Sequence, residues 1–331
     1  DHFTLIINAS KKPLSIDNIP LDDIESVFEG SGGASEGCSS LNTPAPPGIK
    51  AAHRAAFIFD IKHKGSIMIK QNLHCHTTYD DGVNTPEEMV LAAMEYGLTS
   101  LGISLHAPME GEYWCAPKEN VEPFKAEMQR LKEKYAGRLA LYTGLEYDLE
   151  AEKNFSGYEY IIGSGHVLDE HYYVDSTRDR AIELIEHFGG PEKAAAAFFE
   201  NYARIADMPE IGIVGHFDLL TKYNEQGPLY DTESRWYRDA AFAAMEKLNA
   251  AGKIFEINTG AISRGYRTTP YPSPELLRHL CGIGGRITVS SDAHSAESIC
   301  CEFDMAEQLA KRCGFEEIWY FNGSGFASER L

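Results

Sequence analysis

The regular alternation of strand-like and helix-like segments after residue 68 most limits what this chain can fold into. Apolar runs typical of strands end near residues 74, 106, 146, 166, 216, 258, 292 and 321. Most intervals between them have the periodicity of an amphipathic helix, as in 191–208 and 233–252. Seven or eight such alternations predict a parallel α/β barrel rather than a sandwich or a helical bundle. The interval 147–160 is short, so we expect the barrel to be distorted.

One helix has a well-defined start in the sequence. Thr85 is the predicted N-cap, Pro86 occupies the first helical position, and Glu88 completes a capping box. Gly97 follows the end of the apolar pattern. These residues predict a helix between the first two strands.

The first 67 residues differ from the rest of the chain. The stretch 29–48 is rich in Gly, Ser and Pro, a composition typical of a linker or a disordered segment. Met68 directly precedes the first strong strand, so we expect the native start there. We interpret 1–67 as an atypical N-terminal extension, fusion-derived or disordered, and 68–331 as the functional domain.

Composition excludes some classes of partner. The formal net charge of −20 argues against nucleic acid or an anionic membrane surface, because phosphate-rich partners are recognised by an excess of Lys and Arg. An acidic protein can still bind a phosphorylated substrate if bound cations reverse the local charge. No apolar run approaches the roughly 18 residues that a membrane span needs. Seven cysteines without CxxC spacing are typical of a reducing compartment, so we expect a cytoplasmic protein.

Metal-competent side chains follow the predicted strands. Six of the 12 histidines lie at strand ends, together with two acids: His74, His76, His106, Glu146, His166, His216, Asp292 and His294. In a parallel barrel the carboxyl ends of all strands meet at one rim, where active sites are found. The sequence therefore predicts a metal site at this rim.

Strand alternation explains the pair of histidines in "HCH". Residues two apart in an extended segment point the same way, so His74 and His76 can bind one ion while Cys75 faces the opposite side. The same reasoning joins Asp292 and His294 in "SDAH".

The order of these motifs resembles the PHP family, the polymerase and histidinol phosphatase superfamily. The segments "HCHTTYDDG", "SLHAP", "GLEYD", "GSGH", "GHFD", "EINTGAISRG" and "SDAH" span most of 68–331. The resemblance implies a distorted, TIM-like (β/α)7 barrel with three metal ions. It assigns the first ion to His74, His76, Glu146 and Asp292, the second to Glu146, His166 and His216, and the third to Asp81, His106 and His294. Many relatives have a histidine in place of Asp81. Asp80 is the alternative ligand, although we interpret it as a solvated turn residue.

The ligand chemistry indicates the type of ion and of reaction. Mixed imidazole and carboxylate ligands suit Zn²⁺, Mn²⁺ or Fe²⁺ without choosing among them. Such ions lower the pKa of water and bind phosphoryl oxygens, so we expect in-line attack by a metal-bridging hydroxide. Arg264 and Lys222 are candidate phosphate-binding residues, and Arg264 also a catalytic one. Asp292, His294 or water is expected to protonate the leaving group.

Other residues near the motifs receive weaker roles. We interpret Asp218 as a residue that orients a ligand, and His171 as a loop residue. Glu110, Tyr113 and Trp114 follow His106 and either line a substrate pocket or belong to a lid.

The length of 68–331 and the segment "YPSPELL" resemble stand-alone histidinol-phosphate phosphatases. The expected reaction is hydrolysis of L-histidinol phosphate in histidine biosynthesis. The alternatives are a phosphatase for another small phosphomonoester or a nucleotide, an exonuclease, and a metal-dependent binding module without catalysis.

Overall fold

The computed structural model describes residues 5–7, 14–16, 69–169 and 171–331. The chain divides into two compact units, Asp1–Asp60 and Ile61–Leu331. In the first unit, β1 (Leu5–Ile7) pairs antiparallel with β2 (Leu14–Ile16). The predicted linker at 29–48, the start at Met68 and the boundary between 67 and 68 lie outside the described residues.

Seven parallel strands form the central sheet of the second unit, in the order β11-β10-β9-β6-β5-β4-β3. They are β3 (Gln71–Asn72), β4 (Ser100–His106), β5 (Ala140–Asp148), β6 (Tyr160–Ser164), β9 (Ile213–Val214), β10 (Ile254–Asn258) and β11 (Arg286–Ser290). Beyond the ends of β3 and β11, Cys75 and Ala293 form an isolated parallel bridge that joins the two edges of the sheet. The predicted distorted (β/α)7 barrel is therefore confirmed.

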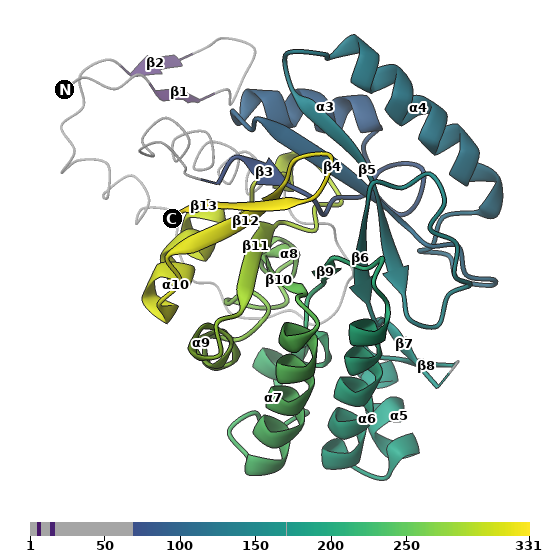
Figure 1. The fold of residues 1–331 in the computed structure, drawn as a ribbon, viewed down its shortest axis with the longest axis vertical. Coiled ribbons are helices and arrows are strands. Elements are labelled where there is room, and N and C mark those ends of the chain that lie inside the picture. Colours follow the sequence, from purple (N-terminus) through teal and green to yellow (C-terminus); the bar gives the residue numbers. More distant parts are fainter. Residues whose placement is uncertain (1–4, 8–13, 17–68, 170) are drawn as a thin grey trace, which may run out of the picture. The chain divides into compact units, whose positions relative to one another are not determined.

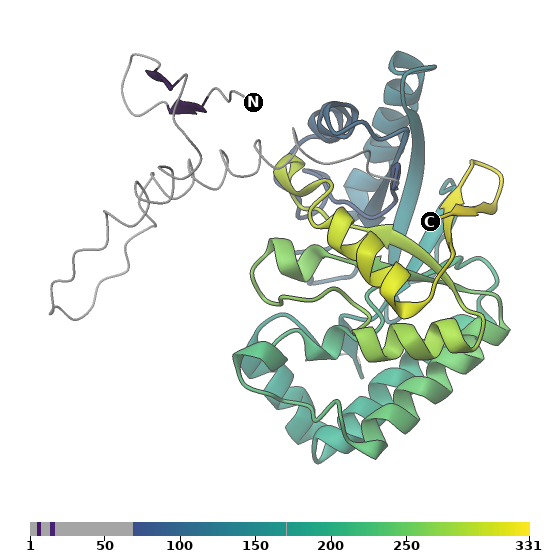
Figure 2. The same cartoon turned by 90° about the vertical axis from the view of Figure 1, so that its left-hand side faces the viewer.

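Helices surround these strands on the outside (Figures 1 and 2). They are α3 (Pro86–Glu95), α4 (Val121–Lys134), α5 (Arg178–Phe188), α6 (Pro191–Ala203), α7 (Arg235–Ala250), α8 (Gly260–Ser263), α9 (Pro274–Gly282) and α10 (Phe303–Cys313). Short 3-10 turns are η2 (Lys118–Asn120), η3 (Arg204–Asp207), η4 (Leu219–Thr221), η5 (Asn224–Gln226) and η6 (Ala296–Ser298). Within the described part of the chain, no helix combines the length and apolar character needed to cross a membrane.

The start of α3 is formed as predicted. The Thr85 hydroxyl accepts a hydrogen bond from the Glu88 backbone N–H, and the Glu88 carboxylate accepts one from the Thr85 N–H. These two bonds satisfy N–H groups that an uncapped helix leaves without partners. The expected irregularity is also present, because β5 and β6 are joined by a loop without a helix.

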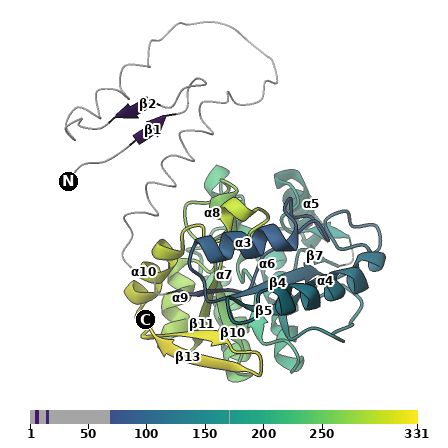
Figure 3. The same cartoon turned by 90° about the horizontal axis from the view of Figure 1, so that it is seen from above.

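Two antiparallel hairpins are added to the barrel: β7 (Val167–Leu168) with β8 (Tyr172–Tyr173), and β12 (Glu317–Phe321) with β13 (Phe326–Arg330). The last strand-like run of the sequence is therefore β12, outside the barrel sheet. Figure 3 shows the second hairpin beside β11. The Gln71 side-chain amide donates to the Phe321 carbonyl at 2.8 Å and accepts from its N–H at 2.8 Å. This exchange fixes the hairpin to the start of β3.

Tyr160 fills the interior of the barrel. Its hydroxyl donates to the carbonyl of Leu73, the residue after β3, at 2.5 Å. Gly102 and Gly144 lie beneath this ring, and a Cβ atom on either would collide with it. The core of the barrel is thus solid, and the polar groups must gather at its ends.

Candidate metal centre

The carboxyl ends of the barrel strands carry all nine predicted metal-binding residues. They come from β4 and β5 and from the segments that follow β3, β6, β9 and β11: His74, His76, Asp81, His106, Glu146, His166, His216, Asp292 and His294. Three overlapping groups of these side chains have ligand atoms within 4.8 Å of one another. Residues far apart in the sequence therefore converge on one rim, as the strand alternation predicts.

The first group contains His74, His76 and Glu146. The Nε2 atoms of the two histidines lie 3.1 and 3.3 Å from Oε2 of Glu146. Asp292 stands beside them, with Oδ1 at 3.6 and 3.4 Å from the same two nitrogens. Asp292 has a φ of 47°, a left-handed conformation that Asp tolerates better than most residues.

The second group uses the other oxygen of Glu146. Oε1 lies 3.0 Å from Nε2 of His216 and 3.6 Å from Nε2 of His166. Oε1 of Glu146 thus faces His166 and His216, whereas Oε2 faces His74, His76 and also Nδ1 of His106 at 3.0 Å. This is the arrangement that the predicted bridging role of Glu146 requires.

The third group combines Asp81, His106 and His294 with His76. Oδ1 of Asp81 is 3.2 Å from Nε2 of His294 and 3.7 Å from Nε2 of His106. The side chain of Asp81 is 28% exposed and that of His294 is 25% exposed, whereas Glu146 is 1% exposed. This group is therefore the one most accessible to solvent.

In four of the histidines, Nδ1 contacts a carboxylate or a phenol hydroxyl. The Nδ1 contacts are His74 with Glu256 at 2.8 Å, His76 with Asp80 at 2.9 Å, His166 with Asp148 at 3.2 Å, and His216 with the Tyr202 hydroxyl at 3.3 Å. The three carboxylates fix the ring orientation and place the proton on Nδ1, which leaves Nε2 free to bind a metal. The sequence analysis assigned no role to Glu256, Asp148 or Tyr202. Asp148 carried a usable signal, because it lies two residues beyond Glu146 and shares its face of β5.

Four ligand atoms of the centre are buried without a hydrogen-bond partner: Nε2 of His74, Nε2 of His76, Oδ1 of Asp81 and Oε2 of Glu146. A buried polar atom without a partner costs free energy, so such atoms are rare and require an explanation. Here all four point into the three groups. These unpartnered atoms and the mixture of imidazole and carboxylate groups fit divalent metal ions.

The charges of the centre are strongly coupled. Burial lowers the pKa of His74, but Glu146, Glu256 and Asp292 outweigh it and raise that pKa well above its usual value. Burial raises the pKa of Glu146, yet His74, His106 and His166 hold it well below its usual range. Glu146 is therefore an anionic ligand at neutral pH.

Asp80 corrects one prediction. Its side chain is 1% exposed, so Asp80 is not the solvated turn residue expected from the sequence. One carboxylate oxygen accepts from the Thr77 N–H at 2.8 Å, and the other from the His106 N–H at 3.0 Å in addition to its contact with His76. Asp80 holds the metal-binding residues, while its neighbour Asp81 points into the third group.

Arg264 lies at the edge of the centre. Its guanidinium donates to the Asp292 carbonyl at 2.9 Å and to Oδ2 of Asp292 at 3.0 Å, and lies 2.9 Å from Nδ1 of His294. Gly260 permits this contact, because a Cβ there would lie only 2.8 Å from Oδ2 of Asp292 and 3.0 Å from the guanidinium. The side chain remains 30% exposed.

Lys222 is engaged elsewhere. Its ammonium group donates to both the carbonyl and the side chain of Asp175, at 2.9 Å each. Burial raises the pKa of Asp175, but Lys222 and then His166 lower it below the ordinary value. Lys222 therefore contacts Asp175, and the charge of His166 in the centre acts on Asp175 in turn.

Asp218 does not hold His216, contrary to the sequence interpretation. Its Oδ2 atom accepts from the Ser273 N–H at 3.1 Å, and burial raises its pKa. Tyr202 takes the position at His216 instead. Asp218 directly precedes η4, where the chain is no longer extended. Strand alternation therefore does not place Asp218 on the same side as His216.

The three candidate residues in the loop after β4 differ in exposure and in contact with the centre. Tyr113 is 86% exposed and Glu110 is also exposed. Trp114 instead packs against the centre, with its ring centroid 4.9 Å from those of His106 and His166. His171 lies in an exposed turn, as expected.

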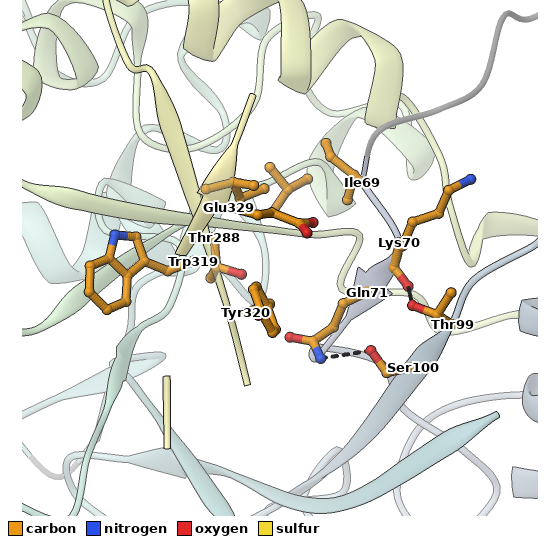
Figure 4. A pocket seen from close by; sticks show the side chains of 11 residues that line it. Ile69, Lys70, Gln71, Thr99, Ser100, Thr288, Trp319, Tyr320 and Glu329 are labelled. Carbon is orange, nitrogen blue, oxygen red and sulfur yellow. Dashed lines mark hydrogen bonds between the residues drawn. The ribbon is translucent and has the colours of Figure 1, made fainter. Parts of the chain in front are cut away.

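A separate cavity of about 320 Å³ lies near the amino ends of β3 and β4 (Figure 4). Gln71, Ser100, Trp319 and Glu329 are among its lining residues, and none of the 11 is a histidine, cysteine or aspartate. It is at the opposite end of the strands from the metal ligands.

Fold and site together define a class: a parallel α/β barrel whose carboxyl rim carries a histidine- and carboxylate-rich centre suited to divalent metals. The family model described as the PHP domain matches residues 72–260, more than half of the chain. The chain belongs to the PHP family.

Individual relatives align over about three quarters of this chain. Histidinol-phosphatase of Lactococcus lactis is 24% identical over 276 residues, 77% of this chain and 96% of that protein. A Deinococcus radiodurans protein named "Probable histidinol-phosphatase" is 28% identical over 269 residues, 75% of this chain and 95% of that protein. A solved structure of the Lactococcus lactis enzyme, described as complexed with zinc, L-histidinol and phosphate, has a TM-score of 0.62 at 21% identity. It covers 78% of this chain and 98% of that chain.

Proposed function

We propose that this protein is a metal-dependent phosphomonoester hydrolase that converts L-histidinol phosphate to L-histidinol and phosphate. The curated relatives named above support the substrate, since their alignments cover nearly their whole length. Residues 68–331 are the catalytic domain in this proposal. The expected setting is histidine biosynthesis in the cytoplasm, and no nucleic acid or membrane takes part.

Three divalent ions, of Zn²⁺, Mn²⁺ or Fe²⁺, form the proposed cofactor set. His74, His76, Glu146 and Asp292 hold the first, Glu146, His166 and His216 the second, and Asp81, His106 and His294 the third. The unpartnered Nε2 atoms of His74 and His76 support the first assignment. The two-sided contacts of Glu146 support its bridging role.

When bound, the ions supply a water acidic enough to ionise near neutral pH and a positive field for the phosphoryl group. Arg264 adds a planar pair of donors at the exposed edge and binds the phosphoryl oxygens. Asp292, which Arg264 holds in place, and His294 lie where the leaving alcohol departs, and one of them or water protonates it. Burial raises the pKa of Asp292, yet Arg264 and His74 keep it well below its usual value, so Asp292 is ionised before reaction and can protonate the alcohol only after it has accepted the proton that the attacking water releases.

Lys222 remains a substrate-binding residue in this proposal, although its ammonium group is paired with Asp175. Its charge is largely compensated by that partner, so its contribution is smaller than that of Arg264.

One observation carries this proposal: the two carboxylate oxygens of Glu146 face separate sets of histidines at a rim that Arg264 borders. The test measures kcat/KM on L-histidinol phosphate, other small phosphomonoesters and nucleotides, before and after chelation and with each metal restored. We expect the highest value for L-histidinol phosphate, loss of turnover on chelation, and recovery with one or more of the three metals. A higher kcat/KM for another member of the panel would reassign the substrate. Turnover that persists after complete metal removal would reject the mechanism.

A further inference from the structure

The loop 107–117 brings an indole to the outer side of the metal centre. The Trp114 ring meets that of His106 at an interplanar angle of 85° and that of His166 at 53°, with both centroids 4.9 Å away. These two histidines belong to different ligand groups. The indole therefore spans two ligand groups.

A carboxylate stands at the edge of that wall. Oε2 of Glu112 accepts from the indole N–H of Trp114 at 3.0 Å, and Oε1 accepts from the Tyr173 hydroxyl on β8 at 2.7 Å. Both donors are neutral, and no Lys or Arg of the described residues forms an ion pair with Glu112. The contrast is Asp175, whose charge Lys222 compensates. Since a carboxylate offers about four acceptor positions, Glu112 has capacity for a further donor.

An uncompensated carboxylate beside an aromatic face is suited to an organic cation. We infer that Glu112 and Trp114 recognise the alcohol part of the substrate, with Glu112 binding an ammonium group and Trp114 contacting a flat ring. The inference rests on the proposed function and deepens it. L-Histidinol phosphate carries a primary amine on the carbon next to the phosphate-bearing one, and an imidazole ring beyond it.

Tyr173, on β8, connects this site to a second part of the chain. Its hydrogen bond to Glu112 connects the loop after β4 to the β7–β8 hairpin, so the carboxylate is held from both sides. Glu112→Gln removes the charge at nearly constant shape. Tyr173→Phe removes one hydrogen bond to the carboxylate and leaves the charge in place. The two variants therefore separate recognition of a cation from support of the loop.

The experiment compares L-histidinol phosphate with its deamino analogue, 3-(imidazol-4-yl)propyl phosphate, on the metal-loaded full chain. A charge-assisted hydrogen bond predicts that Glu112→Gln lowers kcat/KM for the amine substrate by roughly 10- to 100-fold. The same variant should change kcat/KM for the analogue by less than about threefold. The analogue has no amine, so Glu112→Gln has no further interaction to remove. Tyr173→Phe should affect both substrates by one common factor. Metal content, measured by elemental analysis, should equal that of the wild type.

Trp114 is tested with phosphoethanolamine, which keeps the amine and lacks the ring. Trp114→Ala should lower kcat/KM for L-histidinol phosphate about tenfold more than for phosphoethanolamine, and Trp114→Phe should recover most of the difference. Equal losses on both substrates would show that Trp114 only supports the centre.

An equal loss on the amine substrate and its analogue in Glu112→Gln would overturn the role of Glu112, while the proposed function would stand. A wild-type protein that hydrolyses p-nitrophenyl phosphate but not L-histidinol phosphate would overturn the proposed function and this inference together. These two failures are distinguished by the wild-type data alone.

Discussion

Cys75 and Ala293 pair in parallel where the first and last barrel strands meet. The His76 N–H donates to the Ala293 carbonyl at 2.8 Å, and the Ala293 N–H donates to the His74 carbonyl at 3.3 Å. Because both bridge residues face away from the centre, their sequence neighbours on each side face into it. The bridge thus aligns "HCH" with "DAH" and explains why the two motifs act as one site. Cys75 itself is fully buried and donates to the Gly102 carbonyl, as expected for a core residue.

Glu146→Gln tests the residue shared by two ligand groups. The substitution removes an anionic ligand from both, so bound metal should fall and kcat should drop by about 10³-fold or more. Elemental analysis and steady-state kinetics measure the two effects. Glu88→Gln, on the exposed start of α3, is the matched control and should retain both metal and activity. Full metal content with wild-type kcat in Glu146→Gln would reject the bridging role.

Glu256→Gln and Asp80→Asn test the acids behind the histidines. Each change weakens the hold on one ligand, Glu256 on His74 and Asp80 on His76. We expect metal affinity to fall about 10- to 100-fold while the fold is retained. Titration of the metal-free variants with Zn²⁺ against a competing chelator measures this. Wild-type affinity in both variants would mean that these contacts do not orient the ligands.

Arg264→Ala and Lys222→Ala should differ in their effects. Arg264 lies at the exposed edge of the centre, so its loss should lower kcat/KM by about 10²- to 10³-fold with metal content unchanged. Lys222 is paired with Asp175, so its loss should lower kcat/KM by less than about tenfold and reduce thermal stability. Kinetics, elemental analysis and thermal unfolding separate these outcomes. Equal kinetic losses in the two variants would contradict the distinction.

Rising pH should lower the free energy of unfolding of the metal-free protein and increase the stabilisation that added metal provides. Burial lowers the pKa of His166, but Glu146 and Asp148 raise it from 6.5 to about 9. A raised pKa in the folded state stabilises the fold fully below the unfolded value and loses that contribution as pH rises through the folded value. The unfolding free energy of the chelated protein should therefore fall between about pH 6.5 and pH 9. Protons compete with metal for imidazole, so the stabilisation by added Zn²⁺ should grow over the same range. Urea unfolding across this window tests both trends, and a chelated protein that becomes more stable with rising pH would contradict the charge assignment.

Most of the fold was accessible from the sequence because each element carries its own local signal. Thr85 and Glu88 mark the first helix, and the strand-end position of His106 and Glu146 marks the active rim. Alternation alone explains how His74 and His76 reach one site. These features depend on residues a few positions apart, so no tertiary information is needed.

The residues that the sequence did not reveal depend on contacts between distant segments. Glu256 reaches His74 from β10, and Tyr202 reaches His216 from α6, and no spacing rule relates either pair. Asp80 and Asp81 are adjacent acids in a turn, where the local backbone decides which one enters the third group. Lys222 has the expected position after β9, but Asp175, which binds it, lies 47 residues away.

Anomalous X-ray scattering from crystals of the full chain grown with Zn²⁺ or Mn²⁺ tests the central claim most directly. We predict three peaks at the carboxyl ends of the strands, one beside His74, His76 and Asp292, one beside His166 and His216, and one beside Asp81 and His294, with Glu146 in contact with the first two. An absence of anomalous density among these side chains, in crystals where the ion is present in excess, would contradict the account.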